Sequence, residues 1–442
     1  MDAIEVTHYR VYGIRWIQLI VFVLATFSNA ITSITFAPIE SETSKFYKIT
    51  SAEVNSLAIV FLFLYPFGTI LSIWLSRELS MRSTIIIGSI LNLGVFIRLL
   101  SLSNRLNPYI SLIIGQIFPA IAAPFFLNST ALFASRWFSP SQRDIATSIC
   151  SMANPLGLAI GSLVPSLIIT TNPSAREFFI LLISESILVL LATFLIIIVF
   201  RSEPPTPPSS SEEHHQAINF KEDFINLMKN RQYLILLFGF SIGLALFNAI
   251  TTLLEQLIEP QGYSSENAGI FGAIIIIAGL LNAFLAGFIM DKTHSYRLIL
   301  KVLLIGACGS GIFFILILQP NKIYPLAVSI GLMGFFLLPL LPVSFECALE
   351  STYPIRPEWS TGLLMCFGNI IGGVFIFFIG YLIKLDSQYK HQHIFRPSTI
   401  FILCSFIISS LTLFIYKGPY LRLEAEEKSI QKSSINNSSN II

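Results

Sequence analysis

The feature that most constrains the fold is a run of long apolar blocks separated by short polar turns. A helix that crosses a bilayer needs about 20 mostly apolar residues, and about a dozen blocks meet that length. The composition agrees, because 54% of the residues are hydrophobic, only 12% are charged and the mean hydropathy is +0.74. The sequence therefore predicts an all-α polytopic membrane protein with 12 transmembrane helices in two six-helix bundles.

The blocks divide into two equal groups on either side of one polar stretch. We expect an N-terminal bundle over 1–200, a linker over 201–231, a C-terminal bundle over 232–416 and a disordered tail over 417–442. The predicted helices, in order, are Ile14–Ala37, Ala52–Leu75, Ser83–Leu100, Ile110–Ser135, Ile145–Thr170, Phe178–Phe200, Gln232–Ile258, Ala268–Met290, Leu298–Leu318, Tyr324–Leu349, Thr361–Ile383 and Thr399–Tyr416.

The linker combines Pro and Ser clusters with mixed charge, which leaves Ser202–His215 with little to bury. Beyond it, Phe220, Phe224, Leu227 and Met228 recur at helical spacing and predict a short amphipathic helix on the membrane surface. Most Lys and Arg residues fall on the side of the linker. We therefore expect both termini, the linker and the tail to be cytoplasmic, in the plasma membrane or an endomembrane.

Several classes of function are disfavoured by what the sequence lacks. The net charge is only +2, and no basic run with interleaved aromatic residues is present, so we expect no nucleic-acid partner. The five cysteines show no metal-ligand spacing, no P-loop occurs and the histidines form no converging set. We expect no enzyme activity, metal or cofactor. The expected partners are the lipid bilayer and a small-molecule solute, with protons left open, and the protein is expected to be a monomer.

Polar side chains near the middle of apolar helices are candidates to contact a solute, because they are costly in a membrane unless they bind something. Each could instead form only an interhelical hydrogen bond. The predicted substrate-binding residues are Asn29, Ser33, Asn128, Asn248, Thr252, Glu255 and Asn369. For Glu255, proton coupling and a simple interfacial position remain open.

Acidic residues near helix ends suggest gates. Glu185 and Glu255 fall near the outer ends of their helices. Glu346 and Glu350 lie one turn apart near an inner end, where they repel each other unless a base such as Arg82, Arg136 or Arg143 lies between them, or one is protonated. A cytoplasmic ion-pair gate and a solvated helix end are both compatible with this spacing.

The loop after the eighth predicted helix, Gly287–Arg297, resembles the loop motif of the major facilitator superfamily, in which two bundles rock around a central site. Asp291 could cap a helix and pair with Lys292 or Arg297 to latch one state, and we assign these three a gating role. The corresponding first-half loop has Arg77 where the motif has Asp, so that latch is degenerate.

Longer motifs resemble the feline leukaemia virus subgroup C receptor-related transporters, solute carrier family 49, and are closest to the less characterised branch of that family. The motifs are Ser28-Asn29-Ala30, Phe36-Ala37-Pro38, Gly115-Gln116, Trp137-Phe138, Asn154-Pro155-Leu156-Gly157, Pro204-Pro205-Thr206-Pro207-Pro208, Leu253-Leu254-Glu255-Gln256, Asp291-Lys292-Thr293-His294, Phe345-Glu346, Glu350-Ser351-Thr352-Tyr353-Pro354 and Pro419-Tyr420-Leu421-Arg422-Leu423.

The better-known branch of that family is associated with choline, ethanolamine and haem. Its choline cage uses a Trp and a Tyr, whose ring faces bind a cation. The matching positions here are Ser33 and Asn248, and two cage glutamines are replaced by Pro155 and Asn369. The resemblance therefore does not carry over the choline cage, and haem is disfavoured because no His lies in a predicted helix.

Together these features predict a secondary transporter that moves a small polar organic solute, such as an amine, a zwitterion or a vitamin-like molecule, by alternating access. A haem or choline carrier is one alternative. A membrane sensor or receptor that no longer transports is another, and a sizeable folded soluble domain would favour it.

Overall fold

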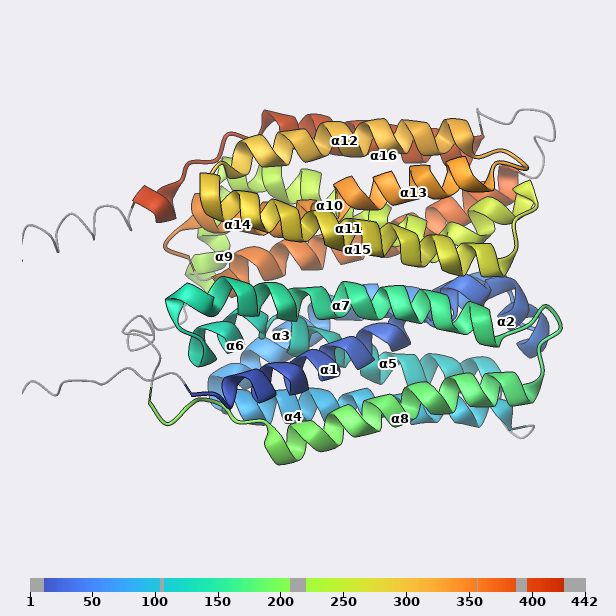
Figure 1. The fold of residues 1–442 in the computed structure, drawn as a ribbon, viewed down its shortest axis with the longest axis horizontal. Coiled ribbons are helices and arrows are strands. Elements are labelled where there is room, and N and C mark those ends of the chain that lie inside the picture. Colours follow the sequence, from blue (N-terminus) through green and yellow to red (C-terminus); the bar gives the residue numbers. More distant parts are fainter. Residues whose placement is uncertain (1–11, 104–106, 207–219, 356, 387–395, 425–442) are drawn as a thin grey trace, which may run out of the picture.

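The computed structural model describes residues 12–103, 107–206, 220–355, 357–386 and 396–424, and these are almost entirely helical (Figure 1). Part of the predicted linker disorder and the predicted tail beyond residue 424 lie outside the described residues. The elements are α1 (Arg15–Ile34), η1 (Ala37–Ile39), α2 (Glu40–Tyr47), α3 (Ser51–Glu78), α4 (Met81–Asn92), η2 (Leu93–Leu102), α5 (Pro108–Leu127), α6 (Thr130–Trp137), α7 (Pro140–Ile168), α8 (Ala175–Val199), α9 (Phe220–Lys229), α10 (Arg231–Ile258), η4 (Glu259–Gln261), α11 (Ser265–Thr293), α12 (Tyr296–Ile317), α13 (Ile323–Leu337), α14 (Leu340–Thr352), α15 (Pro357–Asp386) and α16 (Pro397–Ile415).

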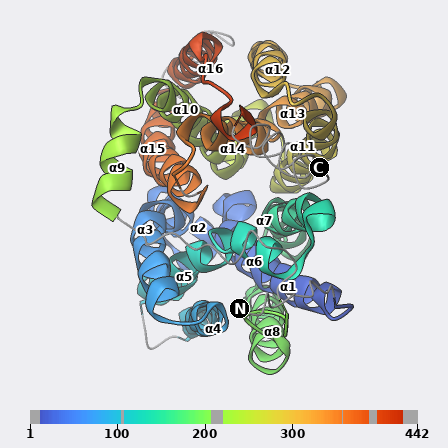
Figure 2. The same ribbon diagram turned by 90° about the vertical axis from the view of Figure 1, so that its left-hand side faces the viewer.

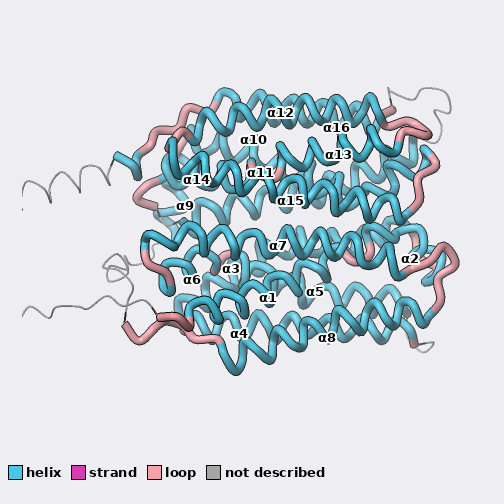
Figure 3. Tube along the Cα trace, viewed as in Figure 1, coloured by secondary structure: helices cyan, strands magenta, loops and turns pink. Residues whose placement is uncertain are grey.

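Twelve stretches of the described residues are long and apolar enough to cross a membrane, which confirms the predicted number of spans. Several spans are built from more than one element, because α1, η1 and α2 run on from one another, as do α4 and η2. Within the described residues of each bundle, most successive spans are joined by short loops (Figure 3). The chain is therefore an integral, multi-pass membrane protein.

The spans form two bundles, α1–α8 and α10–α16, which lie side by side (Figure 2). Across the boundary α7 contacts α11, and α3 contacts α15. Glycine allows the α7–α11 contact: a Cβ at Gly269 would overlap Ser166, and one at Gly272 would overlap Ser162. Small residues let helices pack closely in a membrane, where apolar side chains gain little from leaving lipid.

Two predicted helices are interrupted rather than continuous. The fourth span breaks between α5 and α6, at Asn128 and Ser129, and the tenth breaks between α13 and α14, at Leu338 and Pro339. Pro339 has no N–H to donate to the preceding turn, which explains the second break. At the first break, Asn128 directs its side chain to α3. The breaks fall in corresponding spans of the two bundles.

The start of α1 and the last described turn lie at the same end of the molecule, which we call the termini end; we call the other the far end (Figure 1). The predicted linker helix corresponds to α9. The predicted tail disorder is wrong for its first residues, because Tyr416–Glu424 forms a strap across the C-terminal bundle. The Lys417 amide donates to Gln232 (2.9 Å), and the Arg297 amide donates to the Tyr420 hydroxyl (3.2 Å).

Candidate transport site

A cavity of about 1390 Å³ lies between the two bundles. Its described lining runs from mid-depth residues to Arg136, Tyr353 and Arg422 at the termini end. At the far end the bundles contact each other through side chains that do not belong to this lining. The cavity therefore opens toward the termini and is closed at the far end.

Six of the seven predicted substrate-binding residues line this cavity, namely Asn29, Ser33, Asn128, Asn248, Thr252 and Asn369. They come from four spans, and each was predicted because it is a polar residue near the middle of an apolar helix. Their hydrogen bonds distinguish amides that hold the N-terminal bundle together from amides with donors and acceptors to spare.

Asn248 on α10 and Asn369 on α15 form one pair, in which the Asn248 amide nitrogen donates to the Asn369 side-chain oxygen at 3.2 Å. Gly372 lies one turn along α15 from Asn369, and a Cβ there would approach the Asn248 nitrogen to 3.1 Å. Among the described residues, the other two polar atoms of these side chains, one acceptor and one donor, have no protein partner. If the side-chain nitrogen and oxygen of both amides were exchanged, the pair would still have one unused acceptor and one unused donor.

The other two predicted amides that line the cavity, Asn128 and Asn29, form hydrogen bonds within the N-terminal bundle. The Asn128 side-chain oxygen accepts from the Tyr65 hydroxyl at 3.1 Å, and its nitrogen donates to Thr69 and Ser72. The Asn29 nitrogen donates to Asn92 and to the Pro119 carbonyl, both at 2.9 Å. These two residues hold helices of the N-terminal bundle together.

The cavity changes character along its length. Its described lining contains three charged side chains, Arg136, Glu346 and Arg422, all from segments at the termini end. Deeper in, polar side chains are interspersed with aromatic ones, which include Phe61, Tyr65 and Phe247. An isolated charge is costly to desolvate without an opposite charge, so this inner lining suits a solute of no net charge better than a free cation.

Unlike the other six predicted binding residues, Glu255 does not belong to the described cavity lining. Its side chain is 2% exposed and lies at the far end, where it accepts from the Glu40 amide of the N-terminal bundle. Ser265 on α11 contacts both Glu255, at 2.7 Å, and Glu42 on α2, at 2.9 Å. Glu255 therefore belongs to the contact that closes the far end.

Further hydrogen bonds cross between the bundles at the same end. The Gln256 amide donates to the Asn55 side-chain oxygen at 2.8 Å, and the Ser41 hydroxyl contacts Glu259 at 3.3 Å. The sequence signal for this region was weak, because Glu40 and Glu42 follow the predicted end of the first helix and read as ordinary loop residues. Gln256 was visible only as part of a family motif.

Glu346 and Glu350 are close together as predicted, and an arginine that was not predicted contacts both. Arg422 of the strap lies 3.4 Å from Glu346 and 3.5 Å from Glu350, while the side chain of Arg143, one of the predicted bases, lies outside what the structure describes. The Leu423 amide also donates to Glu350. In this conformation the strap therefore contacts both glutamates within the C-terminal bundle. Hydropathy alone places Arg422 in a free tail, so the sequence did not predict this contact.

The predicted latch residues lie at the termini end, around the end of α11. Asp291 is inside α11, which continues to Thr293, and its side chain is outside what the structure describes. The Lys292 ammonium lies 4.3 Å from the centre of the Phe288 ring, and the Arg297 guanidinium lies 4.5 Å from that of Tyr420. Arg297 thus helps to hold the strap, and its gating role remains a prediction.

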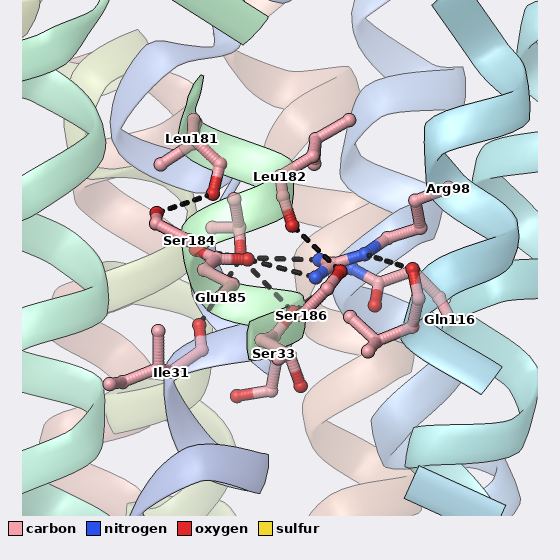
Figure 4. Close-up of polar contacts among 12 residues, drawn as sticks. Ile31, Ser33, Arg98, Gln116, Leu181, Leu182, Ser184, Glu185 and Ser186 are labelled. Carbon is pink, nitrogen blue, oxygen red and sulfur yellow. Dashed lines mark hydrogen bonds and ion pairs between the residues drawn. The ribbon is translucent and has the colours of Figure 1, made fainter. Parts of the chain in front are cut away.

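Glu185 is not a gate residue. Figure 4 shows it on α8 facing Arg98 of η2, and the two form an ion pair at 2.9 Å. The Thr35 hydroxyl adds a contact at 3.0 Å, and the side-chain exposures of Arg98 and Glu185 are 0% and 5%. All three residues belong to the N-terminal bundle, so the pair stabilises that bundle internally.

Comparisons with known proteins agree with this architecture. The Major Facilitator Superfamily model matches residues 19–354. Solute carrier family 49 member A3 of Xenopus tropicalis is 32% identical over 381 residues, covering 83% of this chain and 78% of the relative. The human choline/ethanolamine transporter FLVCR2 is 28% identical over 430 residues, covering 94% and 80%.

Solved structures show the same fold at low identity. A bacterial homologue of the human lysosomal transporter Spinster, in an inward-facing and unoccupied conformation, gives a TM-score of 0.68 at 15% identity and covers 92% of this chain and 98% of that one. The transporter FucP in an outward conformation gives 0.66 at 13%, covering 91% and 99%. The chain belongs to solute carrier family 49 of the Major Facilitator Superfamily and is a secondary transporter, not an enzyme.

Proposed function

We propose that this transporter moves a small polar organic solute, either uncharged or zwitterionic, by alternating access, and that the solute forms hydrogen bonds with the Asn248–Asn369 pair from the cavity. The observation that carries the proposal is the spare acceptor and donor of this amide pair, at the closed end of the cavity. A solute with a neighbouring donor and acceptor, such as an amide or an amino acid, would satisfy both.

Alternating access is supported by the asymmetry of the two ends. Contacts between bundles close the far end, while the cavity reaches the termini end. Carriers of this superfamily move substrate by rocking two bundles about a central site. With the termini in the cytoplasm, as the distribution of Lys and Arg favours, the conformation described here faces inward.

Choline and ethanolamine are candidates because they appear in the name of the human relative. The described inner lining has no acidic side chain to balance a fixed positive charge. We therefore expect choline to be a weaker substrate than a zwitterion of similar size. A free amine stays possible only if the aromatic side chains of the lining can face it.

The test is a flux assay with purified protein in proteoliposomes, using labelled choline, ethanolamine, pyridoxine, haem and neutral amino acids. Asn248→Ala should raise the KM for the transported solute about fivefold without loss of membrane insertion, since a neutral hydrogen bond contributes about 1 kcal/mol. Asn369→Ala should do the same.

Asn128→Ala is the matched control, because both amide atoms of Asn128 already have protein partners. It should lower thermal stability with little change in KM. Unchanged KM values in both Asn248→Ala and Asn369→Ala would remove the amide pair from the binding site. Failure of every tested solute to move would argue against the proposed solute class.

A further inference from the structure

At the far end, three carboxyl oxygens of Glu42 and Glu255 lie within hydrogen-bond distance of the Ser265 hydroxyl. The Ser265 oxygen lies 2.9 Å from each carboxyl oxygen of Glu42 and 2.7 Å from Oε1 of Glu255. A serine hydroxyl carries a single proton. If both glutamates were ionised, Ser265 could donate to only one of them, and its oxygen would face the other carboxylate with no hydrogen between them.

Protonation of one carboxyl resolves this arrangement. One glutamate can then donate its own proton to the Ser265 oxygen, while Ser265 donates to the other. Oε2 of Glu255 accepts from the Glu40 amide, which leaves Oε1 of Glu255 or a Glu42 oxygen to carry the added proton. Glu42 and Glu255 are only 4% and 2% exposed, so bulk water cannot separate their charges.

The surrounding charges favour the same conclusion. The charged groups that act on Glu255 are Glu40 and Glu42, both acidic. Glu40 is 4% exposed, and its Oε1 has no hydrogen-bond partner among the described residues. Glu259 on η4 and Lys384 on α15 act on Glu40, so among the described residues Lys384 is the cation that acts on this group of four carboxyls.

The two carboxyls belong to different bundles. Glu42 is on α2, whereas Glu255 and Ser265 are on α10 and α11. When the far end opens, Glu42 must leave the other two. Ser265 can then serve Glu255 alone, water can solvate Glu42, and the added proton is no longer required.

We propose that closing the far end binds one proton from solvent, shared between Glu42 and Glu255 through Ser265, and that opening it releases this proton. Because this proton is bound from and released to the same side, no net proton crosses the membrane, and pH acts on the gate and not on the solute cavity. The inference builds on the proposed function only in assuming that the far end opens.

The direction of the pH effect follows from this stoichiometry. Low pH supplies the proton and favours the closed far end, and rising pH removes it and favours opening. The ratio of closed to open should fall by up to about tenfold per pH unit over the interval in which the proton is lost.

The test measures the gate directly, without solute. Spin labels on Asn172→Cys and Tyr324→Cys lie in exposed far-end positions on opposite bundles. They would be introduced into full-length protein lacking the partly exposed cysteines Cys308, Cys366 and Cys404. Distances measured by electron spin resonance in proteoliposomes between about pH 5 and pH 8 report the closed fraction.

In otherwise unchanged protein the long-distance population should grow as the pH rises. Glu255→Gln and Glu42→Gln, which cannot ionise, should each reduce the pH effect to less than about twofold over this range. Glu177→Gln is the control, because this exposed far-end glutamate bonds only within the α7–α8 region among the described residues, and it should keep the full effect.

A distance distribution that ignores pH in the parent protein would overturn the proposal, as would glutamine variants that respond like the parent. Solute flux in the same vesicles separates this result from the proposed function. Solute flux together with a pH-independent gate would refute only the proposed proton binding at the far end. A pH-dependent gate without flux would refute only the proposed solute class.

Discussion

Two of the buried glutamates, Glu185 and Glu255, lie in very different settings. Glu185 faces Arg98 at 2.9 Å within a single bundle. Glu255 contacts Ser265 of its own bundle, which also contacts Glu42 across the boundary between bundles, and among the described residues the charges that act on Glu255 are acidic. The first carboxyl is compensated permanently by a neighbouring cation, so it stabilises one bundle in every conformation. The second is compensated only while a proton is present, so it can distinguish one conformation from another.

The largest expected effect comes from breaking the compensated pair. Arg98→Leu leaves Glu185 buried without its cation and should lower the free energy of unfolding by about 3–5 kcal/mol. Thermal unfolding in detergent, followed by the loss of monodisperse protein, measures this change.

The double variant Arg98→Leu with Glu185→Leu is the control for that prediction. Replacing a whole buried ion pair by apolar residues of similar volume is often neutral, so much of the stability should return. An equally unstable double variant would mean that the pair is required for specific packing around Thr35 and Phe36.

The second prediction converts the far-end carboxyl into the compensated type. Glu42→Lys would place an ammonium opposite Glu255, in the role that Arg98 has opposite Glu185. The far end should then stay closed at every pH, and solute uptake should fall at least tenfold, which corresponds to about 1.4 kcal/mol. Uptake kinetics measured from acidic to alkaline pH test this.

Glu42→Gln provides the comparison for Glu42→Lys, because it removes the charge without adding a cation. It should retain uptake and lose only the pH response. If Glu42→Lys transported with the pH dependence of the parent protein, the contrast between the two glutamates would have no functional meaning.

The smallest effect should come from the exposed ion pair at the termini end. The side chains of Arg422 and Glu346 are 35% and 33% exposed, and water therefore screens their attraction. Glu346→Ala, which leaves Arg422 beside the buried Glu350, should lower the free energy of unfolding by about 1 kcal/mol or less. A loss as large as that of Arg98→Leu, in the same thermal assay, would show that the strap is a major element of the C-terminal bundle.

Much of the architecture could be predicted because hydropathy reports directly on membrane spans. The same logic identified Asn248 and Asn369, since an amide in an apolar helix has few uses besides contact with a solute or another helix. The breaks at Asn128 and Pro339 were not predicted, because a proline in a membrane helix can be accommodated with or without interruption.

Contacts between distant residues could not be read from the chain. Nothing near Glu42 in the sequence indicates that it meets Ser265, and nothing near Arg422 indicates that it reaches Glu350. Both residues follow a membrane span and have the composition of ordinary loops. Their roles depend on how the bundles pack, which local periodicity does not encode.

The strap has a consequence for how the protein is made. Arg422 follows all twelve spans in the chain, yet it lines the mouth of the cavity. Every membrane helix can therefore be inserted before the entrance acquires this charge. A chain that ended just after the last span would contain all twelve helices, but its Glu350 would lack Arg422. A variant truncated at Ile415, with an affinity tag in place of the remaining residues, would have the same defect.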